Sequence, residues 1–484
     1  MLEEEFHCLL QRVATRRCEE KTLEIKAAGK ECPERLYDTF SSFSNQDDGG
    51  IILFGVDEQH GFEKIGVYNA QDLQKKLMEV GETMTPPVRP TLSVFEEDGR
   101  VFVTAEIAPI DVSERPCFKT AKGRLKGSYI RVGDADKPMT EYEVYSYEAF
   151  RRQTRDDLRP AEGVPEDMLD VKKVAHYILL RKERRPNLET LSDGQMYELS
   201  GITRNGTMTL AAVLLFSVYP QAYYPQLSII ASCIPGTAMG CLNASGQRFT
   251  DSRRIEGTLS EMLDEAIRFV KTNMRTAIRI DPETGVREDT PDYPIEAVRE
   301  AVLNALIHRD YSVHTENMPI QLLMYSDRLE VRNPGGLYGR MTVDQLGKIQ
   351  PNTRNPMLVT AMEVFGQSEN RYSGIHRIRR AMAEMQLPPP VFCDSRGEFS
   401  VCFYKKSEDM QFAGTASAAP GDDRGIVAFC SEPRTRAEIA SFLNMKSVAY
   451  VRRRYIEPLL SAGMLKCVRE TVGGRKRECY QAEA

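Results

Sequence analysis

The sequence predicts an α+β protein of about three domains, and three observations support this. Its 484 residues exceed the size of one ordinary domain. Hydrophobic residues make up 41% of the chain and charged residues 28%, the balance of a globular protein with proper cores. Alternating runs typical of strands and three-to-four-residue spacings typical of helices occur together throughout the chain, without an internal repeat.

The first domain is predicted to span 1–155. LSVFEEDGRVFVTAEI is the clearest hairpin in the chain, because two alternating runs are joined by Asp98-Gly99. Around it we predict a helix over 1–17, a strand in TLEIKAA, a helix over 36–43, a buried strand in GGIILFGVDE, a strand in SYIRVGD and a helix over 141–150.

The rest of the chain is predicted to form two further domains. The polar, proline-bearing segment RQTRDDLRPAEGVPED is a predicted linker, and IDPETGVREDTPDY is a predicted loop. The second domain covers 165–405 with an upstream linker subdomain. Residues 406–423 are a predicted flexible linker, because they contain the stretch GTASAAPGDD, whose residues are mostly small and polar. The last domain is predicted to span 424–484.

Charge and targeting signals suggest where the protein works. The net charge is −6, but 424–484 carries +6 and the remainder −12, which indicates a basic nucleic-acid-contacting module on an acidic body. The acidic N-terminus has no signal-peptide pattern, and no apolar run approaches about 18 residues. The eleven cysteines contain no C-x-x-C pair. We therefore predict a cytoplasmic protein with reduced thiols and no membrane partner.

Acidic residues gather near the N-terminus. Glu24 and Lys26 lie on one face of the predicted strand TLEIKAA, with Glu19 before it and Asp57 (or Glu58) after the next strand. Carboxylates that converge with a lysine can hold Mg²⁺ or Mn²⁺ against a phosphate. The same alternation is also the ordinary solvent face of a strand.

Four segments follow one another in this order: TLEIKAAGK, FSSFSNQDDGGIILFGVDE, PPVRPTLSVFEEDGRVFVTAEIAP and SYIRVGDADKPMT. Together they resemble the Schlafen AlbA domain over 15–150. The resemblance implies nucleic-acid binding, and in the Schlafen nucleases a three-carboxylate centre cuts RNA. Glu19, Glu24 and Asp57 match that centre. KTAKGRLKG is a predicted loop that either grips phosphates or is a solvated turn. The nucleic-acid groove would use six cations: Lys26, Lys119, Lys122, Arg124, Lys126 and Arg131.

YPIEAVREAVLNALIHRDYS carries the sharpest motif. On a helix, Glu300, Asn304 and His308 fall at i, i+4 and i+8 and therefore project from one stripe, while apolar residues fill the opposite face. An Asn amide oxygen can ligate a hard cation, and a Glu one turn away can orient a water. Taken alone, the same spacing is usually only a polar helix face.

With RLEVRNPGGL, TRNPMLVTAM and ENRYSGIHRI, this helix resembles the GHKL ATPase family, in a divergent RecG-related branch found in proteins described as transcriptional regulators, over about 165–405. The resemblance implies ATP or ADP bound with Mg²⁺ at Asn304, and Glu300 as the catalytic group if ATP is hydrolysed. The other nucleotide-binding residues implied are His308, Asn333, Gly335, Gly336 and Gly374.

Two departures from the GHKL pattern bear on that expectation. NPGG stands where other members carry D-x-G-x-G, so the adenine-reading Asp is missing unless Asn333 replaces it. RYSGI has a single Gly, which leaves fewer free backbone N–H groups for phosphates. The chain also lacks G-x-x-x-x-G-K-[ST], so a helicase motor is not expected.

The last sixty residues have the layout of a winged helix. Two predicted helices are followed by two short strands that flank VGGRKR as a wing. The recognition helix would carry Arg452, Arg453 and Arg454, and the wing Arg475, Lys476 and Arg477. Such a module places a helix in the major groove and the wing on phosphate. Protein contact or dimer assembly is the alternative use.

The leading functional hypothesis is a bacterial DNA- or RNA-binding transcriptional regulator, controlled by nucleotide and working as a homodimer. The first alternative is a metal-dependent RNase or DNase acting through Glu19, Glu24 and Asp57, in defence against phage. The second alternative is a structural dimer whose ATP fold is vestigial.

Overall fold

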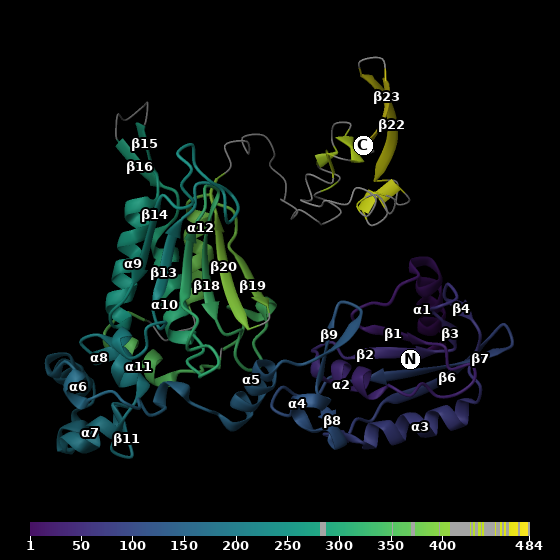
Figure 1. The fold of residues 1–484 in the computed structure, drawn as a ribbon, viewed down its shortest axis with the longest axis horizontal. Helices are drawn as coiled ribbons and strands as arrows, with labels where there is room; N and C mark the ends of the chain where they lie inside the picture. The colour runs from purple at the N-terminus through teal and green to yellow at the C-terminus, as the bar shows by residue number, and fades with distance from the viewer. Residues whose placement is uncertain are drawn as a thin grey trace. The chain divides into compact units, whose positions relative to one another are not determined.

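The structure is a computed structural model that describes residues 1–280, 287–350, 352–368, 373–395 and 397–406, with shorter stretches between 426 and 482. It divides into two compact units, Met1–Lys406 and Ser407–Ala484. The first unit contains two larger sheets with their own helices, coloured purple to blue and teal to green in Figure 1. Among the described residues, no helix is long and apolar enough to cross a membrane.

The first sheet has the strand order β1-β2-β7-β6. β1 (Leu23–Lys26) runs parallel to β2 (Gly50–Phe54), and β7 (Arg100–Ile107) is antiparallel to both β2 and β6 (Thr91–Glu97). The predicted hairpin is confirmed: Asp98 and Gly99 both have positive φ, 52° and 70°, which is what a two-residue turn of the primed type requires.

Strand alternation gives this sheet two buried faces. One face packs against α1 (Glu3–Arg16) through Leu53 and Phe102. The other packs against α2 (Tyr37–Asn45) and α3 (Ala70–Glu82) through Ile52 and Val103. The predicted helices and strands of this region are therefore confirmed, with shifts of a few residues at their ends.

Short elements complete the N-terminal region. They are β3 (Val56–Asp57), β4 (Glu63–Lys64), β5 (Met84–Thr85), β8 (Phe118–Lys119), the 3₁₀ turn η1 (Thr120–Lys122), α4 (Gly123–Gly127), β9 (Tyr129–Val132), β10 (Ala135–Pro138) and α5 (Glu141–Arg152). The segment KTAKGRLKG is not the loop that we predicted, because η1 and α4 make it two successive helical turns.

The second sheet has six strands in the order β14-β13-β17-β18-β20-β19. β13 (Ile229–Cys233) and β17 (Ile320–Met324) are parallel neighbours, and every other adjacent pair is antiparallel. The remaining strands are β14 (Asp251–Ile255), β18 (Arg328–Pro334), β19 (Val391–Ser395) and β20 (Glu398–Tyr404).

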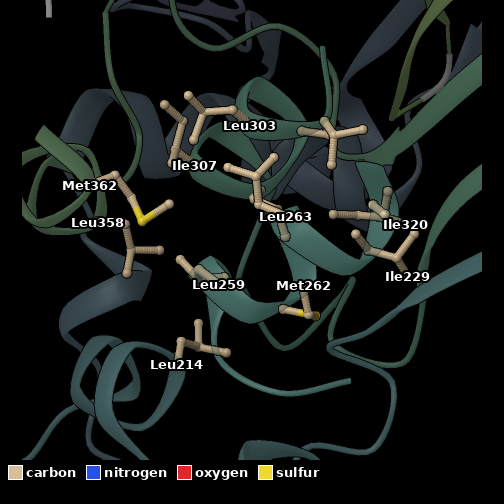
Figure 2. Close-up of a cluster of buried hydrophobic side chains, with 14 of the residues drawn as sticks. Leu214, Ile229, Leu259, Met262, Leu263, Leu303, Ile307, Ile320, Leu358 and Met362 are labelled. Carbon is tan, nitrogen blue, oxygen red and sulfur yellow. The ribbon is translucent and has the colours of Figure 1, made fainter. Parts of the chain in front are cut away.

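Helices pack against this sheet around one large apolar core. α10 (Ile295–His308) lies between α9 (Leu259–Asn273) and α12 (Gly374–Glu384), and contacts both (Figure 1). Figure 2 shows how Leu303 and Ile307 of α10 point toward Leu263 of α9 and toward Met362 of α11 (Pro356–Val364). The apolar stripe of α10 is therefore buried, as its spacing predicts.

Smaller elements precede and border this sheet. They are η2 (Asp156–Leu158), η3 (Glu166–Met168), α6 (Val171–Arg184), η4 (Pro186–Thr190), α7 (Asp193–Leu199), β11 (Thr203–Arg204), β12 (Thr207–Met208), α8 (Leu210–Phe216), η5 (Pro220–Ala222), β15 (Thr276–Ile280), β16 (Arg287–Pro291) and η6 (Val343–Gln345). The predicted loop IDPETGVREDTPDY is wrong at its C-terminal part, because Arg287–Pro291 pairs with Thr276–Ile280 as a hairpin.

The second unit is described in part. Its sheet has the order β21-β23-β22, from β21 (Arg434–Thr435), β22 (Leu465–Val472) and β23 (Arg475–Ala482). β22 and β23 form an antiparallel hairpin, as the sequence predicts for the strands that flank the wing. A small core of its own includes Ile439, Val451 and Ile456. Most of the predicted helical segments and the linker 407–423 lie outside the described residues.

The middle of the predicted linker RQTRDDLRPAEGVPED, Asp156–Leu158, is instead buried in the protein. Asp157 is fully buried, and its carboxylate accepts the backbone N–H of Met357, 3.0 Å away at the start of α11. A carboxylate at a helix N-terminus satisfies an otherwise unpaired amide. Burial raises the pKa of Asp157 to about 6. This segment thus ties the start of the second region to the core.

We expect Asp157→Ala to lower the free energy of unfolding by about 1–3 kcal/mol, because it leaves the Met357 N–H buried without an acceptor. Asp157→Asn, which keeps an acceptor oxygen of the same size, should cost less than half as much. Chemical denaturation monitored by circular dichroism measures both changes. Equal losses in the two variants would contradict the capping role.

Candidate functional site

A cavity of about 290 Å³ lies beside the polar stripe of α10. Its floor is α10 with β18 and β20, and its walls come from residues 335–354, α11 and α12. The structure brings the predicted catalytic residue Glu300 and all the predicted nucleotide-binding residues to this one cavity. They are Glu300, Asn304, His308, Asn333, Gly335, Gly336 and Gly374.

One end of the cavity carries Glu300 and Asn304. The Asn304 amide donates to the Glu300 carboxylate at 3.2 Å, and the Arg377 guanidinium lies 3.5 Å from the same carboxylate. Gly374 begins α12 so close to this pair that a Cβ there would collide with the Glu300 carboxylate. Burial raises the pKa of Glu300, and Arg377 opposes that shift. This end thus combines an amide oxygen, a carboxylate and the N-terminus of a helix.

His308 lies two helical turns further along the same stripe. Burial, followed by the positive charge of Arg354, lowers the pKa of His308 to about 4. The imidazole is therefore neutral near pH 7, with one ring nitrogen as a donor and the other as an acceptor.

The NPGG turn closes this end of the cavity. Gly335 has φ +97°, and a Cβ on it would come within 2.5 Å of both Arg354 and Asp310. Only glycine fits such a position without strain. The Arg354 guanidinium lies 3.1 Å from the Asp310 carboxylate, and both side chains are almost fully buried. Burial acts to raise the pKa of Asp310, but Arg354, the Ser312 N–H and the Tyr142 hydroxyl together lower it.

Asn333 stands on the strand before this turn, in an apolar wall. β18 and β20 pair Val331 with Val401 and Asn333 with Phe399, and all four residues line the cavity. The rings of Phe399 and Phe392 are stacked, with centroids 6.3 Å apart. The Asn333 side chain is 5% exposed, and its Oδ1 has no hydrogen-bond partner among the described residues.

The cavity fits a magnesium nucleotide. Asn304 offers the amide oxygen that a hard cation prefers, and Glu300 offers a carboxylate beside it. Backbone N–H groups at the start of α12, with the helix dipole, suit phosphate oxygens. The apolar wall with Phe392, Phe399 and Val401 suits a planar base.

The N-terminal carboxylates lie together, but around an arginine. Arg131 is buried, with its Nη1 2.6 Å from the Glu24 carboxylate and 3.1 Å from that of Asp136, and its Nη2 3.6 Å from Glu19. Lys26 also donates to Glu24. Burial raises the pKa of Glu19 to about 7. The predicted Glu24–Lys26 face is therefore a buried ion-pair network, and Arg131 belongs to its interior rather than to an open groove.

The third carboxylate of the predicted centre is not part of this network. The Asp57 carboxylate lies 2.8 Å from Nδ1 of the His60 imidazole. Among the described residues, no hydrogen bond or ion pair joins Asp57 to Glu19 or Glu24 or to the cations around them. The charge of Glu58, in contrast, acts on Glu19. Within the part of the chain that the structure describes, no group of three His, Cys, Asp or Glu residues is arranged to hold a metal. Because cations already occupy Glu24, these residues do not fit a divalent ion.

The other predicted cations of this region have three different surroundings. Lys119 and Lys122 each place their Nζ 4.2 Å from the centre of the Tyr37 ring, and Lys122 also donates to the Tyr37 hydroxyl. Lys126 is exposed. Arg124 is instead paired with Glu148 of α5. Lys119 and Lys122 with Tyr37, which we call the Tyr37 patch, form a pair of cations above a buried aromatic ring.

In the second unit, the predicted recognition-helix residues Arg452, Arg453 and Arg454 lie outside the described residues. Arg475, Lys476 and Arg477 begin β23, directly after the predicted wing turn.

Several residues of these sites have no clear sequence signal. Arg354 and Asp310 lie in the segments TRNPMLVTAM and YPIEAVREAVLNALIHRDYS, but the sequence pattern assigns neither residue a role. Tyr142 donates to Asp310 at 2.7 Å from a helix 168 positions earlier in the chain. A contact between residues so far apart leaves no local pattern. Tyr37 looked like an ordinary helix residue, and only the fold brings Lys119 and Lys122 to it.

Comparisons with known families agree with two of the predicted domains. Residues 19–140 match the family described as "Schlafen, AlbA_2", and residues 317–403 match the one described as "Putative ATP-dependent DNA helicase recG C-terminal", of the HATPase type. A Schlafen AlbA domain and a RecG-C-terminal-like ATPase domain are thus present. No curated protein matches the chain.

Two solved structures are similar to this chain. The DIP2311 protein of Corynebacterium diphtheriae is 17% identical, with 99% of this chain and 97% of that chain covered and a TM-score of 0.39. The N-terminal domain of a RecG-related protein from Nitrosomonas europaea is 23% identical, with 28% of this chain and 92% of that chain covered and a TM-score of 0.23.

We expect one of the six histidines to show no protonation between pH 5 and pH 8, because the cavity holds His308 neutral. Proton–carbon NMR of the imidazole Hε1 signals against pH measures this, and His308→Gln should remove the invariant signal alone. Since the folded pKa lies below the unfolded value of about 6.5, His308 favours folding above that value and its contribution is lost as the pH falls toward 4. A His308 signal that titrates near pH 6.5 would contradict the neutral assignment.

Proposed function

We propose that this protein is a nucleic-acid-binding regulator that also binds a magnesium nucleotide. The observation that carries the proposal is the cavity beside α10, whose two ends differ chemically. Glu300, Asn304 and the start of α12 suit a cation and phosphates, and the stacked wall of Phe392 and Phe399 suits a base.

The length of the cavity supports a nucleoside phosphate as its occupant. Glu300 and His308 are eight residues apart on one helix, which corresponds to about 12 Å along its axis. A nucleotide with its phosphates at Asn304 and its base near His308 would therefore lie along the full length of the polar stripe of α10. ATP or ADP with Mg²⁺ is the expected pair, in line with the match to an ATPase-type family.

Nucleic acid is the second proposed partner. The Schlafen AlbA match covers 19–140 and includes the Tyr37 patch. Lys119 and Lys122, which are held beside the buried Tyr37 ring, present two ammonium groups that can hold phosphates. The geometry around Glu24 favours binding over metal-dependent cleavage, because Arg131 and Lys26 neutralise that carboxylate.

The basic C-terminal unit supports duplex DNA binding and hence a regulatory role. In its hairpin of β22 and β23, the second strand begins with Arg475, Lys476 and Arg477. In a winged helix, that is where a wing contacts the DNA backbone. Control of transcription, with the nucleotide as the signal, is the activity that we propose for the whole chain.

We expect millimolar Mg-ATP to raise the melting temperature of the protein by several degrees, since ligand at 100 times its Kd adds about 2.7 kcal/mol of stability. Asn304→Ala should abolish the magnesium-dependent part of that rise, because it removes the amide oxygen. Asn187→Ala, at an exposed asparagine away from the cavity, should keep it. Differential scanning fluorimetry measures all three proteins. A wild-type protein without any shift would contradict nucleotide binding.

Charge reversal tests the nucleic-acid surfaces. Lys119→Glu with Lys122→Glu should weaken binding of labelled RNA, and the triple change of Arg475, Lys476 and Arg477 to Glu should weaken duplex DNA binding. Each lost phosphate contact should also flatten the slope of log affinity against log salt, by about 0.7 for single strands and 0.9 for duplex. Fluorescence anisotropy at several salt concentrations measures both.

The matched control is Lys172→Glu with Lys271→Glu, which changes the net charge as the lysine pair does, at exposed positions of α6 and α9. Its binding should stay near that of the wild type. If the control weakens binding as much as the Tyr37 patch variant does, general electrostatic attraction rather than a defined surface explains the affinity.

A further inference from the structure

The cavity beside α10 has a base end whose hydrogen-bonding groups define which nucleotide fits. That end is formed by His308, Asn333 and Arg354, which the NPGG turn and the C-terminal end of α10 bring together. The opposite end, with Glu300 and Asn304, is the place for cation and phosphates. The inference below rests on the proposed nucleotide binding and extends it to the class of base.

Asn333 is the polar group most free to meet a base. Its side chain is nearly buried in an apolar wall between Val331, Val401 and Phe399. Its Oδ1 has no partner, and among the described residues no hydrogen bond fixes the orientation of the amide. A buried amide left unpaired is costly, so a ligand that pairs with it is favoured. Turning the amide by 180° exchanges its acceptor oxygen and donor nitrogen.

The two neighbours of Asn333 can also donate. His308 is neutral, so either ring nitrogen can carry the proton. Arg354 has donors alone, and its Nη1 makes no hydrogen bond of good geometry among the described residues although Asp310 lies 3.1 Å away. All three groups of the base end therefore have hydrogens to offer.

No acceptor-only group faces this end among the described residues that line the cavity. Glu300 is the one lining carboxylate, and it stands at the phosphate end. Asp310 is held by Arg354 and Tyr142, and Asp394 accepts the Leu337 N–H outside the cavity lining. A carboxylate would favour a base that donates, as the 6-amino group of adenine does. Donors favour a base that accepts, as the 6-oxo group of guanine and hypoxanthine does.

We propose that the cavity accepts 6-oxopurine nucleotides as well as adenine nucleotides, and that Asn333 is the residue that sets this breadth. The amide presents its oxygen to a 6-amino group and its nitrogen to a 6-oxo group, and Arg354 and His308 add donors for the latter. The Kd values for GTP and ITP lie within about tenfold of that for ATP. A site that left one buried group unpaired with either base would discriminate by roughly tenfold or more.

Isothermal titration calorimetry on the full chain with Mg-ATP, Mg-GTP and Mg-ITP tests this directly. ITP is included because it lacks the 2-amino group through which a carboxylate can clamp guanine. The expected result is three Kd values within tenfold of one another. If ATP binds and both GTP and ITP bind more than thirtyfold more weakly, this inference is overturned while the proposed function stands. If none of the three binds at millimolar concentration, the proposed function itself fails, and the inference with it.

Two substitutions assign the breadth to Asn333. Asn333→Leu, similar in volume and without polar atoms, should weaken ATP and ITP alike, by about tenfold each, and keep their ratio. Asn333→Asp, which can only accept, should shift the ATP-to-ITP preference toward ATP by at least tenfold. An unchanged ratio and unchanged affinities in both variants would overturn the role of Asn333. Melting temperatures without nucleotide identify a variant that fails to fold, in which case the wild-type comparison of the three nucleotides decides the inference.

Discussion

The ion pair between Arg354 and Asp310 is the interaction on which the cavity depends. Both side chains are nearly buried, and together they join three parts of the chain. Asp310 follows α10, and its backbone N–H donates to the Pro334 carbonyl within the NPGG turn. Arg354 begins the approach to α11 and lies against Gly335. Removing one partner of such a pair leaves a buried charge alone, which costs about 3–5 kcal/mol.

The same pair explains why the turn has the sequence NPGG. A side chain at Gly335 would displace Arg354 or Asp310, and one at Gly336 would approach the Asp394 carboxylate. The glycines therefore make room for a buried ion pair as well as for a ligand. Tyr142, in the helix that follows the Schlafen AlbA match, donates to Asp310 as well. The walls of the cavity are thus held by residues from far outside the motif that first drew attention to it.

Local patterns predicted the parts of this protein that rest on local physics. The hairpin at Asp98-Gly99 and the stripe on α10 follow from strand alternation, turn chemistry and helical spacing, and the structure has both. The predicted linker was wrong in its middle because the segment is polar and carries prolines, whereas Asp157 is buried against the α11 amide. Likewise, the alternation of Glu24 and Lys26 gave no sign of Arg131, which lies 107 positions after Glu24 and turns an exposed face into a buried network.

The arrangement around Glu300 separates binding from hydrolysis. A carboxylate that orients an attacking water must have a free lone pair directed at it. Glu300 accepts from Asn304 and lies beside Arg377, and burial raises its pKa. Asn304 can offer its Oδ1 to a metal-bound nucleotide while its Nδ2 keeps this hydrogen bond, so binding leaves the contacts of Glu300 in place. A site that holds a nucleotide through Asn304 therefore does not depend on hydrolysis at Glu300, and the regulation that we propose requires the binding step alone.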